Sequence, residues 1–354
     1  MTTRSLISLT RLERAGLWLL NSGIQEPNGG VARYFKSEEK VNAPLSTEIT
    51  GYAVSAFLEL YARTGNVAFL EAAERAGSYL TSVAWRGELN LFPYETDSHG
   101  SDLVYFFDTG IIIRGLLRLW RVTGRAGREM AKLFLAPRGY HCIVRLPSQK
   151  ALPDEPWWSR TPGCFHLKAA LAWKELAELT GDSGFEKHYE RQLAFSLEVW
   201  RELLEVETVP ERLMDRLHPL CYFLEGLLPV VDREPVRAAM REAIEWGGRL
   251  LREIAPRFVR SDVYAQLLRA RLFAEAAGVM PLDVAAAREE FERLEEFQDE
   301  TDTLRHAGGY WFGRKAGQMM PFSNPVSTAF GLQAMSYWHE RKAGVFRADW
   351  RELI

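Results

Sequence analysis

The feature that most constrains the fold is a helix ending that recurs along the chain. In each copy an apolar run closes on Thr-Gly or a similar pair before a more polar segment begins. Three copies align without gaps and a fourth is weaker: 60–66, 119–125, 176–182 and 273–278. Each glycine stands where a helix ends in a left-handed backbone conformation, which glycine adopts without steric cost. These residues are Gly65, Gly124, Gly181 and Gly278.

The spacing of these glycines gives the length of the repeat. They lie 59, 57 and 97 residues apart, and the last interval fits two units of about 48 residues, a length that suits one helix hairpin. The more apolar helix of each hairpin is predicted at 47–64, 107–123, 163–180, 216–231, 262–277 and 325–340. The more polar partners are predicted at 5–22, 66–83, 126–136, 184–204, 234–254 and 283–298, and the first of them packs against the last apolar helix.

The two sets of helices differ as the inner and outer layers of a ring should. In 47–64 and 107–123 most faces are apolar or small, as in helices with neighbours on both sides. In 184–204 one apolar stripe recurs at three- and four-residue steps. Short apolar runs outside helices occur at 142–146 and 310–312, and each is long enough for one strand. We therefore predict an all-α (α/α)6 toroid of six inner and six outer helices, with residues 1–354 as a single domain.

The composition argues against several classes of function. The formal net charge of −3 and the pI near 6.2 do not supply the basic face that nucleic acid requires. The three cysteines, Cys142, Cys164 and Cys221, indicate neither a disulfide framework nor a thiolate metal site. Charged residues from Arg4 to Arg14 interrupt any signal peptide, and no apolar stretch approaches the roughly 18 residues of a membrane span. We expect a cytoplasmic protein with no metal, cofactor, nucleic-acid or membrane partner.

Unusual polar and aromatic residues gather where the inner helices are predicted to begin. In a ring of antiparallel hairpins the inner helices run parallel, so these beginnings meet at one mouth. The candidate binding residues are Tyr52, Asp102, Tyr105, Trp157, Trp158, Arg160, His166, His218, Tyr222, Asp262, Tyr264, Gln266, Tyr310, Trp311 and Asn324. We expect them to surround a small ligand.

Glu48 and Asp108 are the candidate catalytic residues. They lie 60 residues apart, near the starts of consecutive inner helices. Glycoside hydrolysis needs one carboxyl to donate a proton and one to activate water or stabilise a cation. The aromatic residues 105–107 would keep water from Asp108 and so favour it as the donor. The alternative is structural, because acids are favoured in the first turn of a helix and Asp108 suits an N-cap.

The other candidates carry two interpretations each. Aromatic rings can stack on the apolar face of a sugar, but they also fill the centre of a toroid. His166 and His218 could act as acid and base in proton abstraction from a sugar carbon, or form structural hydrogen bonds. Arg160 suits a carboxylate or phosphate on the substrate, or a salt bridge within its loop.

The hairpin count resembles that of the six-hairpin glycosidase-like superfamily, as do Thr-Glu-Ile-Thr-Gly-Tyr at 47–52 and Phe-Asp-Thr-Gly at 107–110. This group includes unsaturated glucuronyl hydrolases and N-acylglucosamine 2-epimerases. In the hydrolases two acids stand at successive inner helices, and the resemblance implies Glu48 and Asp108 for these roles. The first acid is glutamate here and its neighbours differ, so their hydration mechanism does not transfer. The epimerases use paired histidines, whose full pattern is not found around His166 or His218.

Other toroid chemistries lack their motifs. Neither Asp-Asp-x-x-Asp nor Asp-x-Asp-Asp of the terpene-type cyclases occurs, nor does a Cys and His set for zinc. The sequence therefore predicts a glycoside hydrolase that acts on a short or terminal saccharide, acidic saccharides included, through Glu48 and Asp108. The alternatives are a sugar or uronic-acid epimerase or lyase using His166 and His218, and a non-catalytic glycan-binding or scaffold toroid.

Overall fold

A computed structural model describes residues 10–87, 91–96, 103–124, 143–145, 162–205 and 209–354. Most of these residues lie in α-helices, and the strands among them have two or three residues each. The fold is therefore the all-helical one that the repeated helix endings predict.

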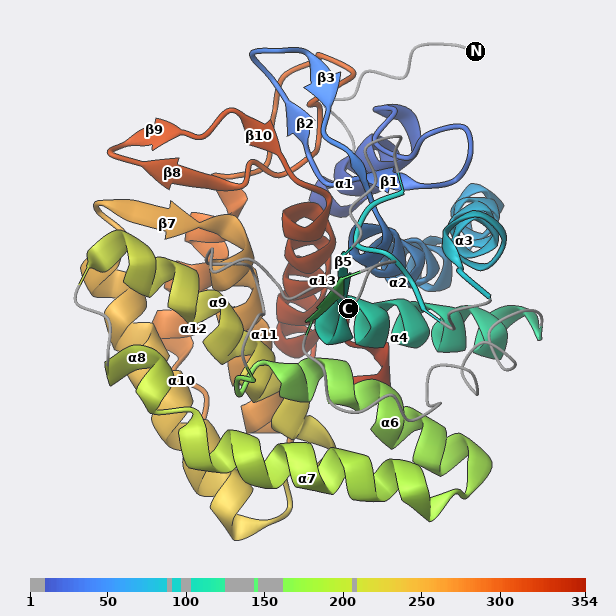
Figure 1. Cartoon of the computed structure of the whole chain (residues 1–354). Helices are drawn as coiled ribbons and strands as arrows, with labels where there is room; N and C mark the ends of the chain where they lie inside the picture. The colour runs from blue at the N-terminus through green and yellow to red at the C-terminus, as the bar shows by residue number, and fades with distance from the viewer. Residues whose placement is uncertain (1–9, 88–90, 97–102, 125–142, 146–161, 206–208) are drawn as a thin grey trace.

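Six helices within the described ranges pack side by side into a closed inner ring (Figure 1). They are α2 (Thr47–Thr64), α4 (Phe106–Thr123), α6 (His166–Thr180), α9 (Pro210–Leu227), α11 (Ser261–Ala276) and α13 (Pro325–Lys342). Each contacts the next in this order, and α13 contacts α2. The largest difference from the prediction is at α9, which begins at Pro210 and not at residue 216. Proline suits the first turn of a helix, and the charged residues that follow it hide the apolar periodicity.

The outer helices pack against this ring. The described ones are α1 (Arg11–Asn21), α3 (Val67–Tyr79), α7 (Ser183–Val199), α10 (Glu234–Ile254) and α12 (Val284–Glu295). Helix α1 contacts α13, as predicted. A five-residue π-helical turn at Leu80–Ala84 follows α3, and the predicted helix 184–204 is divided into α7 and the short α8 (Glu202–Glu205). The predicted helix 126–136 lies outside the described residues.

The recurring Thr-Gly pair has a local physical cause. Gly65, Gly124 and Gly181 have φ values of 67°, 67° and 72°, and Gly278 has 65°, so all four adopt the left-handed conformation. In the three clearest copies the threonine hydroxyl donates to the main-chain oxygen four residues earlier, at 2.6, 2.9 and 2.7 Å. The glycine thus ends the helix by its left-handed backbone, while the threonine hydroxyl adds a hydrogen bond to a carbonyl of the preceding turn.

Two glycines of the inner helices allow close packing. A Cβ atom on Gly51 would lie 2.9 Å from Cα of Ile112, and one on Gly110 would lie 2.6 Å from the main-chain oxygen of Ala169. Such contacts are too short for carbon, so glycine is required where α2 crosses α4 and where α4 crosses α6. The glycines of the runs 47–52 and 107–110 are therefore explained by the ring itself.

Short antiparallel strands mark the end of the ring where the inner helices begin, which we call the N-terminal end. The pairs are β1 (Val31–Ala32) with β4 (Leu45–Ser46), and β5 (Leu103–Tyr105) with β6 (Ile143–Arg145). One three-stranded sheet has the strand order β10 (Phe322–Ser323), β2 (Phe35–Lys36) and β3 (Val41–Asn42). The other has the order β7 (Phe258–Arg260), β8 (Gly313–Lys315) and β9 (Gln318–Met319). Strands β4, β5, β7 and β10 lead directly into α2, α4, α11 and α13. The strand predicted at 142–146 is confirmed by β6, whereas 310–312 contains only isolated bridges just before β8.

The last residues of the chain fill the opposite, C-terminal end of the ring. Leu353 and Ile354 are each 2% exposed. The main-chain oxygen of Ile354 accepts hydrogen bonds from Lys168 Nζ at 2.7 Å and from Arg269 at 3.3 Å. In Figure 1 the C-terminus correspondingly lies within the ring. This segment closes one end of the toroid, so a ligand that approaches the axis would do so from the N-terminal end.

Candidate active site at the N-terminal end

The two predicted catalytic acids lie in the first turns of adjacent helices. Glu48 is in α2, whose N-cap is Ser46, and Asp108 is in α4, whose N-cap is Tyr105. Asp108 is therefore not the cap of its helix, contrary to the structural alternative. It is 1% exposed, and neither of its carboxyl oxygens has a hydrogen-bond partner within the described part of the chain. Buried polar atoms are normally hydrogen-bonded, so this carboxyl is unusual.

The electrostatics of this pair favour its protonated forms. Burial raises the pKa of Glu48 to about 7, against the opposing charges of Arg33 and Lys168. Burial and then the neighbouring Glu48 raise the pKa of Asp108 well above its ordinary value, against the opposing charge of Arg33. The two carboxyls titrate as one coupled system, which holds a proton near neutral pH.

Arg33 is a residue of this site that sequence reasoning missed. It follows β1, and β1 pairs with β4 just before α2. Its guanidinium carbon lies 4.6 Å from the centre of the Tyr94 ring, and it forms an ion pair with Glu95. The Tyr94 ring in turn packs edge-on against Tyr105, with the ring centres 5.2 Å apart. Arg33 lies in a connection between very short strands, and no motif or helical period marks it in the sequence.

An aromatic layer lies one helical turn deeper than the acid pair. Tyr52 is four residues after Glu48 and therefore on the same face of α2. Its hydroxyl donates to that of Tyr222 at 3.1 Å, and its ring meets Phe330 edge-on with centres 5.3 Å apart. The Lys168 ammonium lies 5.7, 5.4 and 5.3 Å from the centres of the Tyr52, Tyr222 and Phe330 rings. These rings form a floor beneath the acids.

His218 belongs to a hydrogen-bonded network on α9 and α11. Because α9 begins earlier than predicted, His218 lies in the middle of its helix and not in the first turn. Its Nδ1 atom is 2.7 Å from Gln266 Oε1 and 3.6 Å from a carboxyl oxygen of Asp262, which Arg260 binds through two nitrogens. Both neighbours of Nδ1 are acceptors, so Nδ1 carries the hydrogen and Nε2 keeps its lone pair. Burial lowers the pKa of His218 to about 4.

His166 is also held neutral. Its ring lies against those of Phe106 and Phe165, with centres 5.6 and 4.3 Å apart, and its Nδ1 is 3.1 Å from the backbone N of Gly163. Burial lowers its pKa to about 4. Both predicted histidines are thus uncharged at neutral pH.

Two further polar atoms near the start of inner helices are buried without a hydrogen-bond partner within the described ranges. They are Nε2 of Gln266 in α11 and Oγ of Ser327 in α13. Ser327 lies one turn before Phe330 and shares its face of the helix. Sequence reasoning named Gln266 but missed Ser327, since a serine in the first turn of a helix is common.

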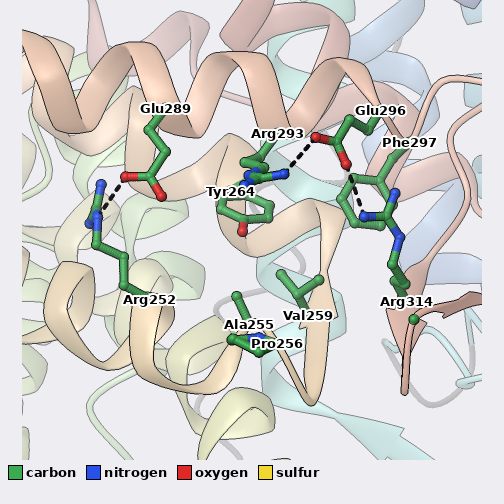
Figure 2. A pocket seen from close by; sticks show the side chains of 11 residues that line it. Arg252, Ala255, Pro256, Val259, Tyr264, Glu289, Arg293, Glu296, Phe297 and Arg314 are labelled. Carbon is green, nitrogen blue, oxygen red and sulfur yellow. Dashed lines mark hydrogen bonds and ion pairs between the residues drawn. The ribbon is translucent and has the colours of Figure 1, made fainter.

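Several predicted binding residues lie elsewhere. Tyr264 lines a pocket of about 310 Å³ between α10, α11 and α12 (Figure 2). In this pocket Arg252 forms an ion pair with Glu289, and Glu296 forms ion pairs with two other arginines. Tyr310 is 1% exposed and packs on Gly331, in the middle of α13. Both rings therefore contribute to helix packing away from the acid pair.

The remaining candidates have structural partners or are not described. Asn324 caps α13, its side-chain oxygen accepting from the backbone N–H groups of Val326 and Ser327 at 2.9 and 3.0 Å. Trp311 is partly exposed and stacks on His306 with ring centres 4.9 Å apart. Four candidates lie outside the described residues, namely Asp102, Trp157, Trp158 and Arg160.

The described residues include neither a helix suited to cross a membrane nor a cluster suited to hold a metal ion. No helix among them is long and apolar enough to cross a membrane. No group of three or more His, Cys, Asp or Glu side chains in the same ranges is arranged to hold a metal ion.

No family model and no curated protein sequence matches this chain. Its structure, however, matches solved toroids over nearly their whole length. A sugar epimerase from a ruminal bacterium has a TM-score of 0.66 and 11% identity, with 92% of this chain and 99% of that chain covered. Cellobiose 2-epimerase from Spirochaeta thermophila has a TM-score of 0.65 and 15% sequence identity, and the match covers 96% of this chain and 100% of that chain. The α-1,6-mannanase from Salegentibacter has a TM-score of 0.55 and 12% sequence identity, and the match covers 95% of this chain and 100% of that chain. The chain therefore has the six-hairpin toroid fold of these carbohydrate-active proteins.

Proposed function

We propose that this chain is a glycoside hydrolase that uses Asp108 as general acid and Glu48 as the ionised partner. The observation that carries the proposal is the Asp108 carboxyl, which is buried, has no hydrogen-bond partner among the described residues and interacts electrostatically with the carboxyl of Glu48. An ionised carboxylate in this position would be unstable, so Asp108 keeps its proton and can donate it. Catalytic acids of this kind are tuned by burial and a neighbouring acid.

In this mechanism Asp108 transfers its proton to the glycosidic oxygen while the bond from that oxygen to the anomeric carbon breaks. Glu48 is more exposed than Asp108, and the charges of Arg33 and Lys168 favour its ionised form, so it carries the negative charge of the pair. It either accepts a proton from the attacking water or stabilises the cationic sugar. Gln266 and Ser327 would offer their unpartnered polar atoms to sugar hydroxyls.

The comparisons support a saccharide ligand. Among the structures with this fold are sugar epimerases, a D-mannose isomerase and the mannanase. An inactive variant of that mannanase was solved in complex with α-1,6-mannotetrose, so the fold accommodates an oligosaccharide. We propose a short or terminal saccharide for this chain because the C-terminal segment closes the ring on one side.

The test is a screen of the whole chain against mono- and disaccharide glycosides, uronates included, followed by kinetics of Asp108→Asn and Glu48→Gln. We expect Asp108→Asn to lower kcat at least about a hundredfold, the low end of general acid catalysis. The matched control is Glu290→Gln. Glu290 is also buried with its pKa raised to about 7 by burial, but it belongs to α12 and pairs with Arg271. Near-normal kcat for Asp108→Asn would remove this residue from the mechanism.

The second candidate function is a sugar epimerase, favoured by the neutral His218 whose Nε2 lone pair could accept a proton from a sugar carbon. It predicts deuterium uptake from solvent into the sugar without hydrolysis. His218→Ala and His166→Ala would then abolish activity while Asp108→Asn and Glu48→Gln remain active, the reverse of the hydrolase outcome.

A further inference from the structure

The pocket shown in Figure 2 is separate from the acid pair. Tyr264 lines it from α11, whereas Asp262 and Gln266, two residues before and after, contact His218 of the inner network. Helix residues that are two apart point in different directions, so α11 presents one face to each region. The volume of about 310 Å³ is at the lower end for small-molecule sites.

The walls of this pocket come from elements that packing and strand pairing hold in place. Glu289, Arg293 and Glu296 follow one another along α12 and its last turn at steps of four and three residues, and therefore share one face. Across the pocket, Val259 of β7 pairs with Arg314 of β8. Directly opposite residues of an antiparallel pair point to the same side of the sheet, and both of these side chains line the pocket.

The charged groups of the lining are unequal in number. Three arginines and two glutamates line the pocket, so one positive charge is in excess. Arg252 has its own partner in Glu289, at 2.8 Å. Arg293 and Arg314 instead share Glu296, and each donates to it from one nitrogen at 2.9 Å. Because a guanidinium has five N–H donors, one shared carboxylate leaves both charge and donors for an anion.

The rest of the lining is aromatic and apolar. The Tyr264 ring packs against Phe297 with the ring centres 6.3 Å apart. The guanidinium carbon of Arg314 lies 5.2 Å from the centre of the Phe297 ring. Ala255 and Pro256, directly after α10, add apolar surface. Figure 2 shows no hydrogen bond between Tyr264 and the other lining residues, so none of them occupies its hydroxyl.

We propose that this pocket binds a small organic anion, namely a carboxylate joined to an apolar body about the size of one ring. The planar guanidinium of Arg314, with Arg293 beside it, receives the two oxygens of the carboxylate. The rings of Tyr264 and Phe297 contact the apolar body. The proposal is independent of the hydrolase mechanism, because neither acid of the pair lines the pocket.

The test is a fluorine NMR titration of the whole chain with para-fluorobenzoate and with its neutral analogue para-fluorobenzamide. The benzoate should bind at least about tenfold more tightly than the benzamide, since hydrogen bonds between charged groups are the stronger ones. Acetate and inorganic phosphate lack the apolar body, so they should displace the benzoate only at concentrations at least about tenfold higher. Equal affinity for the benzoate and the benzamide, or no binding of either, would overturn the proposal.

Two variants of the pocket should change the affinity in opposite directions. Arg314→Met should weaken binding of para-fluorobenzoate at least about tenfold, and Arg314→Lys should weaken it less, because it keeps the charge but loses the planar fork. Glu296→Gln removes the carboxylate that the two arginines share, so the affinity should rise about two- to fivefold. An unchanged affinity in Arg314→Met, or a lower one in Glu296→Gln, would contradict the proposed site.

Two controls assign the binding to this pocket. Arg233→Met is the matched variant, because Arg233 also pairs with a glutamate, binding Glu190 through two nitrogens at 2.7 and 2.8 Å, but lies outside the pocket. It should leave the affinity unchanged. The double variant Glu48→Gln, Asp108→Asn should also bind para-fluorobenzoate as the parent does. Loss of binding in the double variant would assign the anion to the acid pair and overturn the proposal, whatever the outcome for hydrolysis.

Discussion

The two ends of the ring contain buried carboxyls of the same kind in opposite electrostatic settings. At the C-terminal end, Glu59 is bound by Arg118 at 2.6 Å and by Arg63 at 2.7 Å, while Glu225 is bound by Arg269 at 2.5 Å and by Lys168. At the N-terminal end Asp108 has no such partner among the described residues. The inner helices thus neutralise Glu59 and Glu225 at one end, whereas at the other Arg260 pairs with Asp262 but no described residue pairs with Asp108.

This contrast appears directly in the protonation of the acids. Although burial opposes it, Arg118 and Arg63 lower the pKa of Glu59, and Lys168 and Arg269 lower that of Glu225. For Asp108 burial prevails and its pKa is raised. Buried charges that are paired serve packing, whereas an unpaired acid reduces stability and is characteristic of functional sites. This difference is why we propose the N-terminal end, and not the C-terminal end, as the place of the chemistry.

The largest expected effect is at the C-terminal end. Glu225→Gln removes the partner of two buried cations, Lys168 and Arg269, and should lower the free energy of unfolding by about 3–5 kcal/mol. Urea denaturation followed by circular dichroism measures it. Glu242→Gln is the control, because this glutamate forms an ion pair with Arg201 in which both side chains are nearly half exposed, and its loss should change stability by less than about 1 kcal/mol. Equal effects of the two variants would show that the buried ionic layer is not stabilising.

A smaller effect of opposite sign is expected at the N-terminal end. Because the pKa of Glu48 is raised to about 7 and that of Asp108 is also raised, the folded state should lose stability as pH rises from about 4.5 to 7. Asp108→Asn and Glu48→Gln should flatten this decline, so each variant should be at least as stable as the parent at pH 8. Thermal unfolding across this range provides the measurement. A variant that is less stable than the parent at pH 8 would contradict the unpaired state of these acids.

The smallest effect is expected in the aromatic layer between the two ends. Tyr52→Phe removes the hydroxyl that donates to Tyr222 but leaves the ring in place, so stability should fall by about 1 kcal/mol or less. Tyr52→Ala, which also removes the ring, should lower it by about 3–5 kcal/mol. Urea unfolding of both variants separates the hydrogen bond from the packing. A large loss in Tyr52→Phe would mean that the hydroxyl pair, and not the ring, maintains this layer.

Local patterns predicted much of the fold because their causes are local. The glycines at 65, 124 and 181 end helices through their own backbone conformation, and the apolar faces at 47–64 and 107–123 mark helices with neighbours on both sides. The position of α9 was less well predicted, since its first turn is charged. The short strands before the inner helices were mostly missed, because two or three residues provide too little alternation to detect.

The site shows the same division between local and distant causes. The spacing of Glu48 and Asp108 placed them at the starts of adjacent helices, but the same reasoning grouped Tyr264 and Tyr310 with them. Tyr264, near the start of α11, lines the pocket between α10, α11 and α12, whereas Tyr310, which lies before β8, packs on Gly331 of α13. Helix register alone does not distinguish these directions.

The sequence by itself determined the hairpins, their endings and the presence of acids at successive inner helices, since each depends on residues a few positions apart. Only the tertiary structure decided which acids are paired. Glu225 meets Arg269 across 44 residues, and Arg33 approaches the acid pair because short strands bring its segment to the start of α2. Charge interactions depend on distance and burial, not on sequence separation, so Glu225 is ion-paired while Asp108 has no such partner among the described residues.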